Sequence, residues 1–328
     1  MKLQFINVGY GESVLLTANR PDGSAFTMLI DGGSGEDAEY AGHPARVRAA
    51  DYLNELGITR LDVLFNTHIH EDHTCGLYGV VQECDIGEYW CCALPEDSIN
   101  WTELPRDIIT VPSSDKCLRA LNTHRKLLQR FRDKGVPIRN LQQGAELHLP
   151  AEGLSIQVLG PSPAEVAEMF GRMERLYSKG PREDRKEYLL DVDRTMNNHS
   201  AMLMLNYYGT KILLPGDTNY AGYEHLPSQA LRADIFKVGH HGQRDGVDEA
   251  LVRAVSPRVV IVCASSDRRY ESMHPEILSL FKAHDPGTTY MLSDTPELAP
   301  RTNGIPAHRV SELTVQKDGS IHTAYIPA

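Results

Sequence analysis

The sequence predicts a single α/β domain over residues 1–328, in which two stacked sheets carry helices on their outer faces. Two observations lead to this prediction. Strand-like and helix-like segments are mixed along the whole chain, and a unit of hairpin, helix and strand occurs twice. The 328 residues, 41% of them hydrophobic, are enough to build a large core, and no low-complexity linker divides the sequence.

The expected strands are short apolar or β-branched runs bounded by turn residues, at 3–8, 13–17, 26–31, 61–66, 86–93, 154–159, 200–207, 211–215, 234–239, 258–263, 288–293, 310–316 and 320–325. The expected helices have apolar residues at helical spacing, at about 45–57, 115–134, 163–177, 222–231, 246–254 and 274–283. The polar stretch 178–200 lies between two apolar patterns, and we expect it to be a long loop over one face of the domain.

The repeat places polar residues at the ends of strands. In the first half, two strands around a Pro-Asp-Gly turn lead to Asp31, and after a helix another strand leads to His68. In the second half, two strands around Tyr-Gly-Thr lead to Asp217, and after a helix a further strand leads to His240. We therefore expect these strand ends to converge at one edge of the stacked sheets.

The stretch "LDVLFNTHIHEDHTCGL", residues 61–77, has the pattern of a metal site. An apolar strand is followed within six residues by His68, His70, Asp72 and His73. Alternate residues of an extended segment point the same way, so His68 and His70 can share one ion, and Asp72 and His73 can turn to a second. Imidazole together with carboxylate favours zinc, manganese or iron over an all-oxygen calcium site.

The second half supplies further candidate ligands. Asp217 follows an apolar strand, and a carboxylate at a strand end is well placed to bridge two cations. His240 and His241 follow another strand, and Gly242 after them permits close approach of the backbone. His199 opens the strand that leads to Asp217, although a histidine at this point could also be an ordinary solvated residue.

The order "THIHEDH", "NNHS", "LLPGDT" and "GHHG" resembles the metallo-β-lactamase fold hydrolases over nearly the whole chain. Together with "FINVGYGESVLL" and "HPEIL", these motifs are most similar to the soluble hydrolase domain of the ComEC competence proteins and their stand-alone relatives. The resemblance implies a four-layer αββα sandwich with two metals at one edge, which agrees with the repeat.

The resemblance also implies roles for individual residues. The expected metal ligands are His68, His70, Asp72, His73, His199, Asp217 and His240. In this assignment Asp217 bridges the metals and His240 is the last ligand, which leaves His241 for the substrate. His274 is the candidate for a leaving-group acid or a phosphate contact, with helix capping as the alternative.

We therefore expect an enzyme, a metal-dependent hydrolase in which two divalent cations, zinc or else manganese or iron, hold a bridging hydroxide that attacks a phosphodiester. Asp72 would also accept a proton from the attacking water, and His241 would stabilise the phosphoryl oxygens. Two alternatives stay open: a hydrolase of thioesters or lactones on the same metal site, and a noncatalytic metal-binding regulatory protein.

The net charge of −11, from 33 basic and 44 acidic residues, favours a small phosphodiester or a short nucleic acid as substrate and disfavours stable binding of duplex DNA. The basic stretch 119–135 predicts either a contact with a polyanion or the solvated face of an amphipathic helix, with its leucines and Phe131 inward. The start lacks a signal-peptide pattern, no apolar run reaches about 18 residues, and the six cysteines fit neither a disulfide framework nor a zinc ribbon. We expect a cytoplasmic protein that makes no membrane contact.

Overall fold

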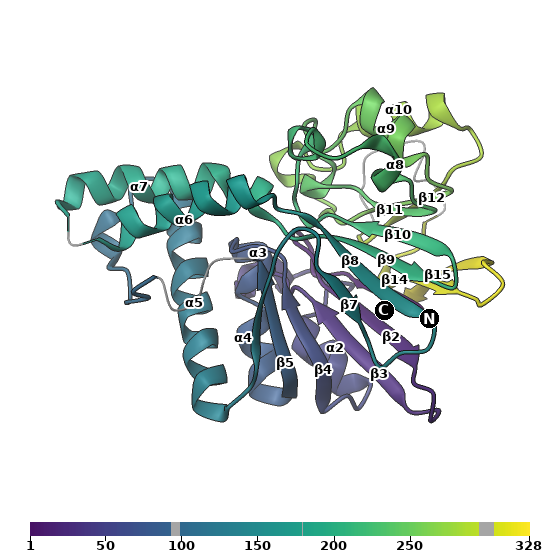
Figure 1. Ribbon diagram of the computed structural model, residues 1–328, viewed down its shortest axis with the longest axis horizontal. Coiled ribbons are helices and arrows are strands. Elements are labelled where there is room, and N and C mark those ends of the chain that lie inside the picture. Colours follow the sequence, from purple (N-terminus) through teal and green to yellow (C-terminus); the bar gives the residue numbers. More distant parts are fainter. Residues whose placement is uncertain (93–98, 179, 295–304) are drawn as a thin grey trace.

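The computed structural model describes residues 1–92, 99–178, 180–294 and 305–328, and it contains two large sheets (Figure 1). The first sheet has the strand order β15 (Ile321–Pro327), β14 (His308–Val315), β1 (Lys2–Ile6), β2 (Val14–Asn19), β3 (Ala25–Ile30), β4 (Arg60–Asn66), β5 (Asp85–Cys92) and β6 (Ile138–Leu141). The second has the order β13 (Thr289–Leu292), β12 (Val259–Val262), β11 (Ile235–Lys237), β10 (Thr210–Leu214), β9 (Met202–Tyr207), β8 (Leu154–Gly160) and β7 (Glu146–His148).

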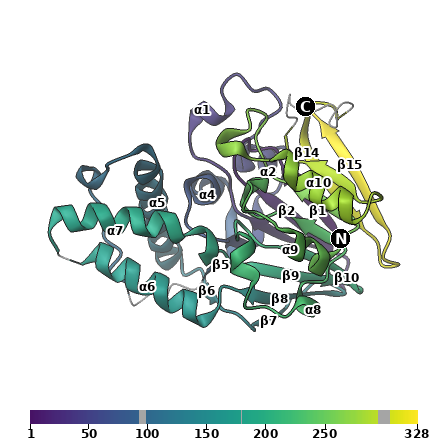
Figure 2. The ribbon, with the colours of Figure 1, turned by 90° about the horizontal axis from the view of Figure 1, so that it is seen from above.

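Helices cover the outer faces of both sheets. They are α1 (Asp37–Tyr40), α2 (Ala49–Glu55), α3 (Glu71–Thr74), α4 (Leu77–Glu83), α5 (Pro112–Lys134), α6 (Pro163–Tyr177), α7 (Arg182–Thr195), α8 (Ser228–Leu231), α9 (Glu249–Val255) and α10 (Pro275–His284). Viewed from above, α5, α6 and α7 lie together on one side of the molecule (Figure 2).

The core is divided into layers that follow from this arrangement. One buried cluster, which includes Phe65 of β4 and Leu203 of β9, fills the space between the two sheets. A second cluster packs α2, α4 and α5 on the outer face of the first sheet, and a third packs α9 and α10 on the outer face of the second. The predicted αββα sandwich is therefore confirmed.

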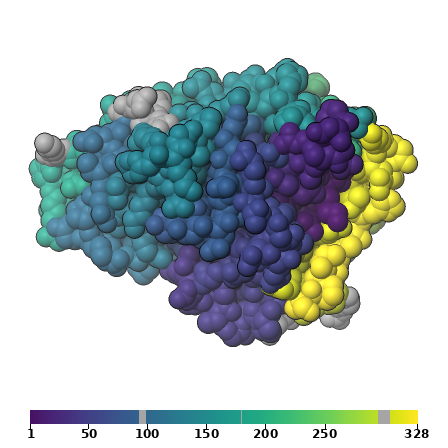
Figure 3. Space-filling view, turned by 90° about the horizontal axis from the view of Figure 1, so that it is seen from below, coloured from purple at the N-terminus to yellow at the C-terminus, as the bar shows by residue number. Residues whose placement is uncertain are grey.

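The pairing of the strands brings distant parts of the sequence together. β1 is antiparallel to β14, so the C-terminal strands lie against the N-terminal segment, as the yellow and purple surfaces of Figure 3 show. β3 is parallel to β4, and β10 is parallel to β11. Because parallel strands end at the same edge of a sheet, the residues that follow these four strands gather in one region.

The expected loop at 178–200 is wrong. Most of this stretch forms α7, in which Leu189 and Val192 are three residues apart and fully buried. Both belong to a fourth apolar cluster together with residues of α5 and α6, such as Met173. This tertiary packing, rather than local propensity, determines that the charged segment becomes a helix.

The structure also describes the basic stretch 119–135, the cysteines and the apolar character of the helices. Within α5, the leucines of the basic stretch 119–135 and Phe131 are buried, as an amphipathic helix requires. The six cysteines are free and five of them are buried. In the described part of the chain, no helix has the length and apolar character needed to cross a membrane. The last residue of the expected strand 86–93 lies outside the described residues.

Candidate metal centre

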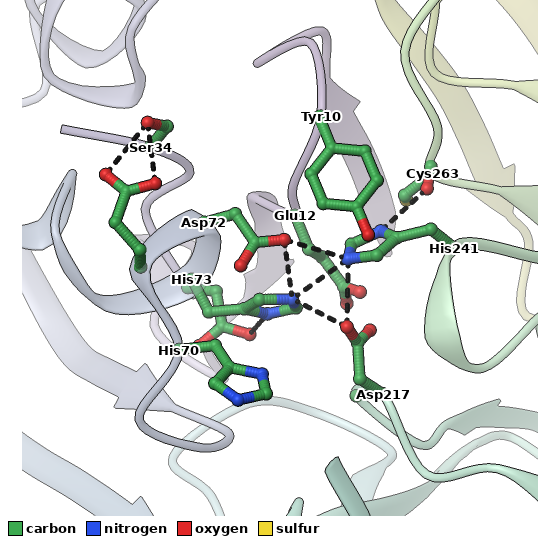
Figure 4. A network of polar contacts seen from close by, with 12 residues as sticks. Tyr10, Glu12, Ser34, His70, Asp72, His73, Asp217, His241 and Cys263 are labelled. Atoms are coloured by element: carbon green, nitrogen blue, oxygen red, sulfur yellow. Dashed lines mark hydrogen bonds and ion pairs between the residues drawn. The ribbon is translucent and has the colours of Figure 1, made fainter. Parts of the chain in front are cut away.

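Four side chains from three strand ends converge at one edge of the sandwich. Potential ligand atoms of Asp72, His73, Asp217 and His241 all lie within 4.8 Å of one another. Asp72 and His73 belong to α3, which follows β4, whereas Asp217 follows β10 and His241 follows β11. Figure 4 shows the two histidine rings and the two carboxylates pointing toward a common centre. The convergence of strand ends predicted from the repeat is thus observed.

The distances within this cluster are those of hydrogen bonds. His241 Nε2 lies 3.0 Å from Asp72 Oδ2 and 2.9 Å from Asp217 Oδ2, and His73 Nε2 lies 3.2 Å from the same Asp217 oxygen. The rings of His73 and His241 are fully buried. One oxygen of Asp217 therefore contacts both imidazoles, which is the arrangement expected of a carboxylate placed between ligands.

Electrostatics indicate that this cluster requires positive charge. Burial lowers the pKa of His241, but the Asp217 and Asp72 carboxylates outweigh burial and raise this pKa to about 9. Burial also lowers the pKa of His73, which Asp217 and Asp31 raise well above its usual value. Burial raises the pKa of Asp217, but the neighbouring cationic side chains hold it well below its usual range. The ionised carboxylates thus keep protons on the two buried imidazoles. Divalent cations would supply the same positive charge in place of these protons, so the cluster fits a site for such cations.

His68 and His70 lie beside the cluster and close to each other. His68 Nε2 is 3.1 Å from His70 Nδ1, and the rings of His68 and His73 have their centroids 4.2 Å apart. Burial, together with the charges of His73 and His70, lowers the pKa of His68 well below its usual value. A neutral imidazole has a free lone pair, so His68 has the protonation state of a metal ligand.

Within the pair His240 and His241, the expected geometry is reversed, because His241 and not His240 enters the cluster. Alternation along an extended backbone does not apply, since both residues have left-handed φ angles, 47° and 51°. His240 Nδ1 lies 2.7 Å from Asp245 Oδ1, and Asn197 Nδ2 lies 2.9 Å from His240 Nε2. His241 Nδ1 lies 2.9 Å from the carbonyl oxygen of Cys263, a contact that leaves Nε2 to face the cluster.

The structure does not bring His199 into the cluster. Its ring is buried and lines a hollow of about 220 Å³ on the side of α6, together with Met169 and Arg172. Burial lowers the pKa of His199 to about 3, so the ring is neutral, and among the described residues neither ring nitrogen has a hydrogen-bond partner. The short helical turn Asn197–His199 after α7 directs the side chain away from the donor groups.

His274 lies at the start of α10 and acts as its cap. Its Nδ1 accepts a hydrogen bond from the backbone N–H of Glu276 at 3.3 Å, and its Nε2 lies 3.1 Å from Arg244 Nε. Both ring nitrogens are therefore engaged, and His274 is absent from the described lining of the cleft beside the metal centre. In the structure His274 therefore caps a helix, and its position does not support the expected role as a leaving-group acid.

Asp31 is a supporting residue that the site assignment from the sequence does not include. Its Oδ2 lies 2.7 Å from His73 Nδ1 and accepts a hydrogen bond from Thr67 Oγ1 at 2.6 Å. A carboxylate on the outer nitrogen of a histidine fixes the tautomer and the orientation of the ring. The sequence does contain a signal for it, because Asp31 ends a strand at the position that Asp217 occupies in the second half.

A cleft of about 280 Å³ opens onto the cluster. Its lining includes the carboxylates of Asp72 and Asp217 and, beyond the cluster, His240, the cationic side chains Lys116 and Arg194 and the acidic side chains Glu71 and Asp193. The aromatic side chains Tyr10 and Tyr270 also line it, with their ring centroids 5.2 Å apart. The Tyr10 ring lies over His241 at a centroid distance of 4.5 Å, as Figure 4 shows.

The fold and the site together identify the class of protein. The family model of the metallo-β-lactamase superfamily matches residues 7–109, which include β2 to β5 and the segment from His68 to His73. Together with the αββα architecture, this match over part of the chain shows that the protein has the metallo-β-lactamase fold.

Particular relatives are consistent with the predicted resemblance. ComE operon protein 3 of Bacillus subtilis (strain 168) is 23% identical over 295 residues, which cover 86% of this chain and 31% of that protein. Recombination protein 2 of Haemophilus influenzae is 25% identical over 87 residues, 26% of this chain and 11% of that protein. The chain thus spans about a third of the length of the first relative and about a tenth of the second.

Among solved structures, the chain is similar to CmlA, a diiron β-hydroxylase from Streptomyces venezuelae. The TM-score is 0.44 with 14% sequence identity, and the alignment covers 88% of this chain and 52% of that one.

Proposed function

We propose that this protein is a phosphodiesterase that uses two divalent metal ions and acts on small phosphodiesters or short single-stranded nucleic acids. The observation that carries the proposal is the adjacency of two donor groups at one sheet edge: the pair His68 and His70 beside the cluster of Asp72, His73, Asp217 and His241. One ion would be held by each group, with Asp217 as the shared carboxylate. When bound, such ions activate water near neutral pH and stabilise negative charge that develops on a phosphoryl group.

The side chains around the cleft support an anionic substrate. Lys116 and Arg194 line the same cleft as the metal-ligand carboxylates, so they can pair with phosphate oxygens while the carboxylates hold the metals. The same lining also holds the carboxylates of Glu71 and Asp193, so the bound metal ions would have to supply most of the positive charge that offsets the net charge of −11 for a small anion. A long duplex would extend beyond the cleft and meet the overall negative field.

His240 takes the substrate-facing role that the sequence analysis gives to His241. It lines the cleft, and Asp245 at 2.7 Å from its Nδ1 orients the ring. A histidine held by a carboxylate in this way can donate a proton from its other nitrogen to a leaving oxygen. In the structure the side-chain amide of Asn197 contacts Nε2 of His240, and a substrate oxygen would take the place of this amide.

Hydrolysis of thioesters or lactones on the same metal site is the alternative activity. An acyl group would need an apolar wall, and the described lining offers the rings of Tyr10 and Tyr270 among mainly charged and polar side chains. The deciding experiment measures turnover of bis-p-nitrophenyl phosphate against a lactone and a thioester panel, before and after chelation and after adding back zinc or manganese. Rapid lactone or thioester turnover without cleavage of any diester would refute the proposed reaction, and a metal-loaded protein inert on all esters would favour a regulatory role.

A further inference from the structure

A buried ion pair lies directly behind Asp217. Lys237, the last residue of β11, pairs with Glu12, and both side chains are completely buried. The Lys237 ammonium also donates to the carbonyl oxygen of Gly216 at 2.8 Å and lies 3.3 Å from Asp217 Oδ1. Glu12 comes from the turn between β1 and β2, so the pair joins the two sheets at the edge where the metal centre lies; Figure 4 shows Glu12 behind the cluster.

Each member of the pair contacts a different half of the centre. Lys237 contacts Oδ1 of Asp217, whereas Oδ2 of the same carboxylate lies toward His73 and His241. On the other side, the backbone N–H of Glu12 donates to the carbonyl oxygen of Asp72 at 3.2 Å. The ion pair thus links the backbone of Asp72, one candidate ligand, to the carboxylate of Asp217, which the two ions would share.

Stability alone does not account for such a pair. Removing two charges from water costs free energy that their attraction only partly repays, and apolar residues of similar volume commonly stabilise a core at least as well. The pair is also neutral as a whole, so it does not change the net charge that a metal ion meets. What it does supply is a hydrogen-bond donor fixed on one particular oxygen of Asp217.

We propose that Lys237 is a positioning residue of the metal centre: supported by Glu12, it holds Asp217 so that a single oxygen, Oδ2, faces the metal ligands. The inference rests on the proposed metal site but is independent of the substrate. Removing an outer hydrogen-bond partner of a metal ligand costs about 10–100-fold in metal affinity, which is the expected size of the effect.

Two double variants separate orientation from charge. Glu12→Gln with Lys237→Met removes both charges and the donor to Asp217, whereas Glu12→Gln with Lys237→Gln removes both charges but leaves an amide that can still donate. Both keep the net charge of the site unchanged. The matched control is Glu249→Gln with Arg253→Met, which removes an exposed ion pair on α9. The readout is zinc affinity, measured by competition with a chromophoric chelator, with folding checked by circular dichroism.

We expect zinc affinity to fall 10–100-fold in the methionine variant and to stay within about threefold of wild type in the glutamine variant and the control. Equal affinities in a folded methionine variant and wild type would overturn the inference, as would a tenfold or larger loss in the glutamine variant. The glutamine variant therefore remains decisive if the methionine variant does not fold. Failure of the wild-type protein to bind zinc, manganese or ferrous iron would instead refute the proposed metal site.

Discussion

Replacing His241 and His240 separately by alanine distinguishes a metal ligand from a substrate contact in adjacent residues. His241 Nε2 lies 2.9 and 3.0 Å from the two carboxylates of the cluster, whereas His240 is held outside it by Asp245 and Asn197. Loss of an outer partner of a ligand costs about 10–100-fold in metal affinity, so loss of a direct donor costs at least about 100-fold, or ~2.7 kcal/mol. His241→Ala should therefore lose zinc and activity together.

His240→Ala should keep zinc within about threefold of wild type and lose phosphodiester turnover by roughly 10²–10⁴-fold, the range for a general acid. Zinc content after gel filtration, zinc affinity by chelator competition and kcat on a small diester measure the two effects separately. His225→Ala, at an exposed position, is the control and should change neither. If His240→Ala empties the site while His241→Ala retains zinc, the assignment of the pair from the structure is wrong.

Four further predictions follow from individual contacts. Asp31→Asn removes the carboxylate that orients His73, and chelator competition should show zinc affinity reduced about 10–100-fold. Lys116→Ala should raise KM for a small diester by roughly tenfold with kcat nearly unchanged in steady-state kinetics, because the lost charge-assisted contact is to the substrate. Burial lowers the pKa of His124 to about 3, so between its folded and its usual pKa only the unfolded chain binds a proton at this histidine. The wild-type protein should therefore lose unfolding free energy as the pH falls from 7 to 5. Urea titrations should show this loss to be smaller in His124→Gln than in wild type, by about 2 kcal/mol. At fixed salt, gel assays should show single-stranded oligonucleotides cleaved faster than long duplex DNA, and efficient duplex cleavage would contradict the charge argument.

Local sequence patterns predict two stacked sheets with helices outside and place several candidate ligands at the ends of strands, and the family resemblance adds the four-layer αββα arrangement, which the structure has. A strand followed by several donor groups is a short-range signal, and the repeat indicates that a second set of strand ends lies at the same edge. Parallel pairing aligns strand ends within each sheet, and the stacking of the two sheets then brings the residues after β4, from His68 to His73, close to Asp217 after β10.

The rest depends on contacts between distant segments. The backbone at His241 is left-handed, and its carbonyl oxygen accepts a hydrogen bond from the N–H of Met273, so the direction of the ring is determined by a loop about thirty residues away. His199 turns toward α6 because the preceding segment forms α7, a helix that becomes stable only by packing on α5 and α6. The pairing of Glu12 with Lys237 joins two sheets and has no local pattern.

The distribution of charge explains how a protein with a net charge of −11 can be suited to an anionic substrate. Asp72 and Asp217 line the cleft and would hold divalent cations, and Lys116 and Arg194 line it together with the acidic side chains Glu71 and Asp193. A phosphate group in the cleft would thus meet the bound metal ions and these two cationic side chains, while the rest of the surface repels it. Because charges on an exposed surface are screened within about 10 Å at 0.1 M salt, the local arrangement outweighs the net charge for a ligand small enough to fit the cleft. The same reasoning limits the substrate, since each additional phosphate beyond the cleft meets repulsion, and we infer that selectivity for short substrates should weaken as salt is raised.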